Sequence, residues 1–238
     1  MKAVSIEHSK AVYFADFAFY LVAIVLLLGV LVGFAPRHAL VGVVLAVIAG
    51  AVCWSLIEYL MHRVIFHGIE PFQCMHGEYH RRPQALIATP TALSAAFIML
   101  LVWLPATLLS GAWLGLGATL GMTADYFAYG LIHHAMHHWR PRGAWMRQRK
   151  RLHALHHRAP QQNYGVTTSL WDHVFRSFRQ SQVKGMSSLS SHAGPPFQSR
   201  NRLIVRRADL PDARMAACAL AVLLSLGLGL ATPAKRSP

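Results

Sequence analysis

Acidic residues are few in this sequence. Nine aspartates and glutamates stand among 238 residues, against 23 lysines and arginines, and the formal net charge is +14. Carboxylate-rich di-metal sites in helix bundles draw glutamates from several facing helices, partly as Glu-x-x-His pairs. With so few carboxylates such a site is excluded, and any metal would have to be coordinated by other side chains.

Cysteine is also scarce. The three cysteines, at positions 53, 74 and 218, are odd in number and have no Cys-x-x-Cys spacing. Cys53 and Cys218 fall within apolar runs, where a free cysteine behaves as a small hydrophobic side chain. These two are therefore interpreted as packing residues.

Aromatic residues are few within the basic stretches. Most of the cations occupy three segments, 63–82, 140–184 and 200–214. Proteins that bind single-stranded nucleic acid interleave cations with aromatic side chains on which the bases stack. Attraction to anionic lipid headgroups explains the charge at least as well, so we expect no nucleic-acid partner.

Long apolar runs separate the basic segments. A helix needs about 20 apolar residues to cross the hydrocarbon core of a bilayer, and four runs have this length: 11–34, 39–60, 86–109 and 112–132. The turns at 34–39 and 110–111 carry a single arginine, so the positive-inside rule places the other, basic side in the cytoplasm. The sequence predicts an all-α, multi-pass integral membrane protein with four transmembrane helices in two hairpins.

The rest of the chain is interpreted around these spans. Residues 1–184 are predicted to form the membrane-embedded domain, with the first apolar run retained rather than cleaved. Pro105 is expected to kink or end the third span. Residues 185–214 are predicted to be a linker, and residues 215–231 a C-terminal hydrophobic helix that crosses the membrane or lies along its interface.

Histidine is unusually clustered. Of the 15 histidines, eleven lie in four groups near the predicted cytoplasmic ends of the spans. Spacings of three and four residues place most of these rings on shared helix faces. Imidazole binds iron, zinc, copper and nickel well, and nine or more imidazoles are too many for one ion. The clusters predict a cytoplasmic helical cap that holds two metal ions through histidine.

The first cluster has a different spacing. His62 and His67 are five residues apart. On an α-helix of 3.6 residues per turn, such side chains point about 140° away from each other. This suits ligands of two different ions, or a helix that ends between the two residues.

The motifs occur in a characteristic order. They are EYLMHRVIFH (58–67), HGEYH (76–80), HHAMHH (133–138) and LHALHH (152–157), followed by NYGVTTSLWDHVF (163–175). This order resembles the fatty acid hydroxylase and sterol desaturase superfamily of integral-membrane, histidine-rich diiron oxygenases. The resemblance runs from about residue 20 to about residue 180.

The resemblance implies a set of nine metal ligands: His62, His67, His76, His80, His133, His137, His153, His156 and His157. It places His134 and His138 beside the ligands or at the substrate mouth. Tyr79 stands where the family has a histidine, and Gly130 where an aspartate is usual. We expect Tyr79 to hydrogen-bond a water at the metal, with direct ligation as the second interpretation.

Three carboxylates are candidates for orienting the ligands. A metal-bound imidazole usually donates its second ring N–H to a carboxylate or a carbonyl. Glu58 lies one turn before His62, and Asp172 follows the last motif, although Asp172 could instead cap a helix. Asp125 lies within the fourth predicted span, where an ionisable residue is a functional candidate by default, or is satisfied by a neighbouring helix.

The resemblance implies an O₂-dependent lipid hydroxylase with two irons, for which zinc can substitute in isolated protein. Fatty-acyl or ceramide-like chains are the favoured substrates, ahead of carotenoids and sterols. No heme-binding or flavin-binding segment is recognised, so we expect a separate ferredoxin-like or cytochrome-like electron donor. The alternatives are a metal-handling membrane protein and a pseudoenzyme whose altered second motif no longer holds both metals.

Overall fold

The computed structural model describes residues 7–70 and 72–180, and in this part of the chain all regular structure is helical. The predicted all-α class is therefore confirmed. The linker at 185–214 and the hydrophobic helix at 215–231 lie outside the described residues.

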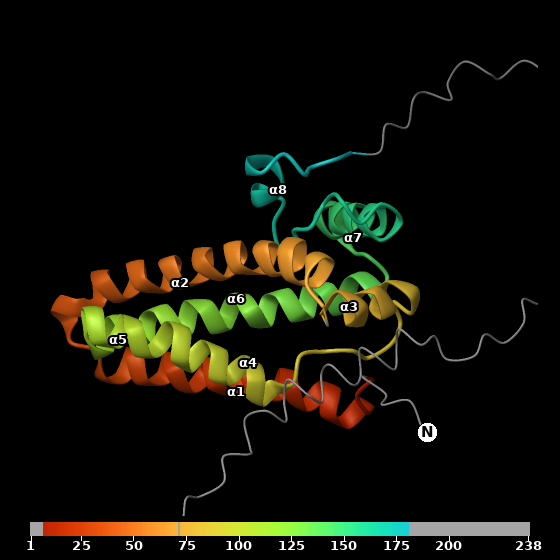
Figure 1. Cartoon of the computed structure of the whole chain (residues 1–238). Coiled ribbons are helices and arrows are strands. Elements are labelled where there is room, and N and C mark those ends of the chain that lie inside the picture. Colours follow the sequence, from red (N-terminus) through yellow and green to blue (C-terminus); the bar gives the residue numbers. More distant parts are fainter. Residues whose placement is uncertain (1–6, 71, 181–238) are drawn as a thin grey trace, which may run out of the picture.

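The apolar helices form a bundle. They are α1 (Lys10–Phe34), α2 (Leu40–Leu60), α4 (Thr91–Ile98), α5 (Leu104–Ser110) and α6 (Ala112–His138). Helices α4 and α5 are parts of one continuous helix, Thr91–Ser110. A short 3-10 turn, η1 (Arg37–Ala39), precedes α2, while the π-helical segments η2 (Met61–Phe66) and η3 (Met99–Trp103) extend α2 and join α4 to α5. Figure 1 shows the long helices side by side, with α3 (Phe72–Arg81) and α7 (Gly143–Arg158) where α2 and α6 finish, and α8 (Leu170–Val174) beside α2.

The bundle consists of two helical hairpins. The first joins α1 to α2 through η1, and the second joins α5 to α6 at Gly111. Gly111 has φ 85° and ψ 165°, a backbone conformation essentially restricted to glycine. The interruption predicted at Pro105 is the π-helical segment η3, which ends two residues earlier. A proline lacks the N–H of the regular helix and clashes with the carbonyl four residues before it, so a local change of helix geometry relieves both.

Helix α6 lies at the centre and meets its neighbours through small residues. A side chain at Gly50 of α2 would collide with the backbone carbonyl of Ala118, and one at Gly121 would collide with that of Val47. Small residues let membrane helices approach closely enough for backbone contact. The core beside this contact contains Trp54 and the fully buried Met122.

Three helices in the described ranges are long and apolar enough to cross a membrane: Lys10–Phe34, Arg37–Phe66 and Thr91–Ser110. They expose large apolar side chains, such as Leu26 and Leu109, and indicate a membrane protein. Helix α6, predicted as the fourth span, is not among the three. It is packed between α1, α2 and α5, so less of its surface has to be apolar.

Candidate metal centre

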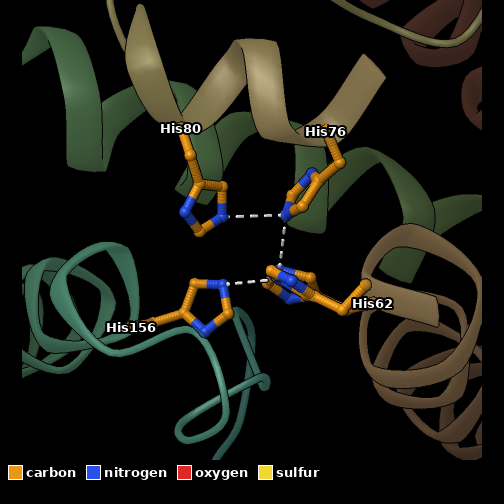
Figure 2. A group of neighbouring side chains, drawn as sticks. His62, His76, His80 and His156 are labelled. Carbon is orange, nitrogen blue, oxygen red and sulfur yellow. Dashed lines mark hydrogen bonds between the residues drawn. The ribbon is translucent and has the colours of Figure 1, made fainter. Parts of the chain in front are cut away.

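The nine predicted ligands converge at one end of the bundle. They come from four places: the end of α2 with η2, then α3, the last turns of α6, and α7. In Figure 2, His76 and His80 of α3 point toward His62 and His156, which approach from the opposite side. Segments that are distant in sequence therefore build one site.

Five of the histidines form a first group, which we call the five-histidine group: His62, His67, His76, His80 and His156. One ring nitrogen from each lies within 4.8 Å of the others. The Nε2 atoms of His62 and His76 are 3.1 Å apart, and those of His76 and His80 are 3.0 Å apart (Figure 2). Five nitrogen donors this close together fit the coordination sphere of one metal ion.

A second group, the three-histidine group, consists of His133, His137 and His153. The Nε2 atoms of His137 and His153 are 2.8 Å apart, while the buried Nε2 of His133 has no hydrogen-bond partner among the described residues. A buried nitrogen without a partner is costly in a folded protein, and a metal ion at this point would satisfy it. The donor set therefore fits a second ion.

His157 belongs to neither group but lies between them. Its Nε2 is 3.0 Å from that of His153, and its ring stacks on His80 with centroids 4.2 Å apart. The prediction that His157 is a ligand is compatible with this place, since the side chain reaches the three-histidine group.

The structure corrects the expectation for the first cluster. His62 and His67 do not point apart toward two ions, and the helix does not stop between them: both residues lie in the five-histidine group. The segment that joins them, η2, is π-helical. A π-helix bonds residue i to residue i+5, so residues five apart fall about one turn apart on the same side.

Backbone carbonyls orient two of the imidazoles. Nδ1–H of His62 donates to the carbonyl oxygen of Tyr164 at 2.5 Å, and Nδ1–H of His156 donates to that of Gln162 at 2.8 Å. Both acceptors lie in the segment that follows α7, which we call the 162–167 loop. With Nδ1 protonated, the Nε2 lone pair of each ring is left to face a metal.

Two buried carboxylates hold this loop. Glu58 accepts hydrogen bonds from the amides of Val166 (2.6 Å) and Thr167 (3.2 Å) and from the Thr167 hydroxyl (2.5 Å). Asp172 of α8 accepts from the amides of Tyr164 (2.8 Å) and Gly165 (2.9 Å). Glu58 and Asp172, the predicted orienting residues, thus contact the loop, and carbonyls of this loop accept hydrogen bonds from the rings.

The remaining candidates lie outside both groups. His134 stacks on His138 with centroids 4.3 Å apart, and its Nδ1 is 3.2 Å from the hydroxyl of Tyr13 in α1. Asp125 is half-buried two turns before His133, and within the described residues its carboxylate makes no hydrogen bond. None of the three is placed to ligate beside the nine converging histidines.

Tyr79 is buried beside the three-histidine group. Its ring centroid lies 5.2 Å from those of both His133 and His137, and its side chain is 8% exposed. Burial, followed by the charges of neighbouring tyrosines, raises the pKa of Tyr79 above its usual range. Gly130, the other departure from the family pattern, faces Phe17 of α1.

Two imidazoles of the site that lie outside the membrane helices, those of His80 and His156, are held neutral. Burial, with neighbouring histidines adding to it, lowers the pKa of His80 to about 3. Burial also lowers the pKa of His156 to about 4, although its bond to the Gln162 carbonyl opposes the shift. Neutral imidazole is the form that ligates a metal, so both rings are ready to bind at neutral pH.

Two features of the site were not predicted from the sequence. The role of the 162–167 loop was unassigned because its key atoms are backbone carbonyls, which carry no side-chain signature. Arg149 belongs to the cation-rich segment 140–184, yet it is 6% exposed and donates from Nη2 to the hydroxyl of Ser169 at 2.9 Å. The signal in the sequence for its place beside the site is its position one helical turn before His153.

Known proteins match much of the chain. The sequence model described as fatty acid hydroxylase matches residues 47–177. The dihydroceramide fatty acyl 2-hydroxylase FAH2 of Arabidopsis thaliana is 32% identical over 142 residues, which cover 55% of this chain and 59% of that protein. The fatty acid 2-hydroxylase of Homo sapiens is 30% identical over 142 residues, which cover 54% of this chain and 38% of that protein. The chain therefore spans less than two thirds of the length of these relatives.

A solved structure supports the fold. It is described as full-length scs7p with only the hydroxylase domain visible, and it superposes with a TM-score of 0.61 at 22% identity, covering 71% of this chain and 67% of that chain. At this identity the likeness is evidence for the fold alone. Since the family model covers more than half of the sequence and includes all four histidine motifs, the chain belongs to the fatty acid hydroxylase family.

Proposed function

We propose that this protein is an O₂-dependent hydroxylase that acts on the acyl chain of a membrane-dissolved lipid, such as a fatty acid or a ceramide-like lipid. The observation that carries the proposal is the convergence of nine histidines at one end of a bundle of apolar helices. A lipid chain could reach such a site without leaving the bilayer. The names of the relatives, fatty acid and dihydroceramide fatty acyl 2-hydroxylases, favour this substrate class over carotenoids and sterols.

The proposed cofactor is a pair of irons. The five-histidine group would hold one, and the three-histidine group with His157 the other, where the Tyr79 hydroxyl would donate a hydrogen bond to a water at the ion. Bound iron would supply the O₂ chemistry that attack on an unactivated C–H bond requires. The residues of the chain hold the ligand nitrogens in place, keep bulk water out and limit which carbon can approach. Zinc is a substitute expected in isolated protein.

The proposed topology has four spans, with α6 as the fourth, and the site on the cytoplasmic face. Both hairpins open toward the site, where the described cation-rich residues of 63–82 and 140–180 also lie. This arrangement follows the positive-inside rule. It also argues against a transporter, since transporters place their ligands near the middle of the bilayer.

Electrons would come from a separate ferredoxin-like or cytochrome-like donor. The outer face of α7 carries a pocket of about 360 Å³ lined by Arg147, Gln148 and Arg151, among others. His153 and His156 lie on the buried side of the same helix, so an acidic donor at the pocket would be about one helix diameter, roughly 10–12 Å, from the site. Lipid headgroups are the competing partner for these cations.

The test combines metal analysis with lipid analysis. Protein purified without oxygen should contain about two irons per chain, and cells that express it should accumulate hydroxylated acyl chains. The variant His153→Ala should abolish the product, whereas His173→Ala, at an exposed residue outside both groups, should not. Two bound irons with no change in any oxidised lipid would favour a metal-handling protein, and a single ion would favour a pseudoenzyme.

A further inference from the structure

Helix α8 lies against the last turns of α2 before the site. Nε1–H of Trp171 donates to the hydroxyl of Ser55 at 3.0 Å, and the ring of Phe175 stacks on Tyr59 with centroids 5.3 Å apart. Arg63 donates from Nη1 to the carbonyl of Phe175 at 3.3 Å. Three contacts, spread over two turns at the end of α2 and the start of η2, therefore set the position of α8 and its C-cap Phe175 along the axis of α2.

This position coincides with the expected edge of the hydrocarbon core. The apolar part of α2 begins at Leu40, and about 20 residues of helix cross the core, so the core should end near Leu60. Ser55 and Tyr59 fall just before that point, and Arg63 just after it. An arginine there can extend its side chain into the headgroup region.

The outer face of α8 is apolar. Leu170 and Val174, four residues apart and therefore on one side of the helix, are 54% and 56% exposed, and Phe175 is 42% exposed. No described residue covers the exposed side of Leu170 or Val174, whereas Phe175 stacks on Tyr59 with one face of its ring. The next turn carries the exposed cations Arg176 and Arg179, whereas Asp172, the acidic residue of α8, is buried.

Apolar side chains flanked by cations are typical of helices that lie in a membrane interface. We propose that α8 lies at the boundary between headgroups and acyl chains on the site side of the bilayer, with Arg176 and Arg179 against lipid phosphates. This surface is continuous with α2, whose Val52 and Leu60 are also exposed. The partner is thus an anionic leaflet, and the proposal rests on the membrane placement given above, not on the reaction.

The contact has a consequence for the metal centre. Asp172 lies in the middle of α8 and holds the amides of Tyr164 and Gly165, and the Tyr164 carbonyl orients His62. A shift of α8 would therefore move the ring of His62 through two hydrogen bonds, between Asp172 and the Tyr164 amide and between the Tyr164 carbonyl and His62. The bilayer surface holds α8, and α8 holds the 162–167 loop in place.

Photo-crosslinking tests the position of α8. Benzoylphenylalanine replaces Leu170 or Val174, one at a time, in the full chain in nanodiscs that contain anionic phospholipid. Leu26 of α1, 63% exposed on an apolar helix, is the positive control. The exposed Ala144 of α7, beside the cations for which lipid headgroups compete, is the comparison position for contact with headgroups alone. After irradiation, intact mass should reveal phospholipid adducts at positions 26, 170 and 174 and clearly fewer at 144.

The link to the metal centre has its own measurement. The double variant Leu170→Gln, Val174→Gln should release metal to a chelator about tenfold faster than the wild type, because local opening of α8 becomes easier. The matched variant Ala144→Gln should release metal at the wild-type rate.

Several results would overturn the proposal. Absence of lipid adducts at 170 and 174 removes the membrane contact, and adducts with residues 215–231 or with another protein assign this face to a different partner. Lipid adducts with an unchanged release rate disprove the link to the metal centre. None of these readouts requires turnover, so failure of the proposed hydroxylase activity would be seen separately.

Discussion

The two histidine groups are held in different ways. In the five-histidine group, carbonyls of the 162–167 loop fix the rings of His62 and His156, and two buried carboxylates hold that loop. For the rings of the three-histidine group, no such bond to a carbonyl or carboxylate exists within residues 7–70 and 72–180. Hydrogen bonds to the 162–167 loop thus fix rings of the five-histidine group. The three-histidine group has fewer nitrogen donors and lies beside Tyr79.

This difference suggests a division of work between the two ions. Mutation of a residue that hydrogen-bonds to a metal ligand typically lowers metal affinity or activity by about 10–100-fold. Metal sites that react keep a coordination position open, whereas structural sites are closed. We therefore expect the ion in the five-histidine group to bind more tightly, and the ion in the three-histidine group to be the more accessible one.

The largest effect is expected from removal of a ligand. His156→Ala should reduce the metal content from about two ions per chain to about one or none, since it removes a donor and its bond to the loop. His137→Ala should lose the weaker ion alone. Metal analysis by mass spectrometry counts the ions in both variants, and chelator competition measures the affinity of any ion that remains. That ion should be the weaker one in His156→Ala and the tighter one in His137→Ala, and equal affinities would contradict the proposed difference.

A smaller effect is expected from the carboxylates behind the loop. Asp172→Asn and Glu58→Gln keep the shape of each side chain but weaken its hydrogen bonds with the loop amides. Affinity for the ion in the five-histidine group should therefore fall by about 10–100-fold. The second ion should be unaffected, as measured by chelator competition. Asp16→Asn is the control, because that carboxylate accepts a hydrogen bond from Thr91 instead. If both ions weaken together, the loop does not serve one group.

Changes at Tyr79 should act on the other group. Tyr79→His would add an imidazole where donors are fewest, and affinity for the second ion should rise by about tenfold. Tyr79→Phe should leave the metal content unchanged if the phenol only hydrogen-bonds a water. Loss of one ion in Tyr79→Phe would mean that the phenol ligates, while unchanged iron and activity in Tyr79→His would mean that no ligand was missing.

The smallest effect is expected outside both groups. Tyr13→Phe removes the hydrogen bond between α1 and His134, and should lower the free energy of unfolding by about 0.5–1.5 kcal/mol. Neither ion should be affected. Thermal unfolding in detergent measures the first quantity and metal analysis the second, and a loss of metal would bring His134 into the ligand set.

Much of the site was predictable because it depends on local spacing. Clusters such as HALHH carry their rings on one helix face whatever the helix packs against, so their convergence could be expected from the sequence. The arrangement of His62 and His67 could not, because the spacing of the residues does not reveal the π-helical segment between them. The role of Glu58 was partly predictable, since a glutamate within an apolar span is costly unless it has partners.

The sequence by itself determined the helical class, the apolar spans and the histidine supply, because hydropathy and spacing act over a few turns of one helix. The tertiary structure decided which histidines share a group, that Tyr79 adjoins the smaller group, and that Glu58 and Asp172 act through the 162–167 loop. The physical reason is that these relations join residues up to about a hundred positions apart through backbone carbonyls and amides, as in the bond from the Val166 amide to Glu58. Every residue carries those groups, so no pattern of side chains records which of them will meet.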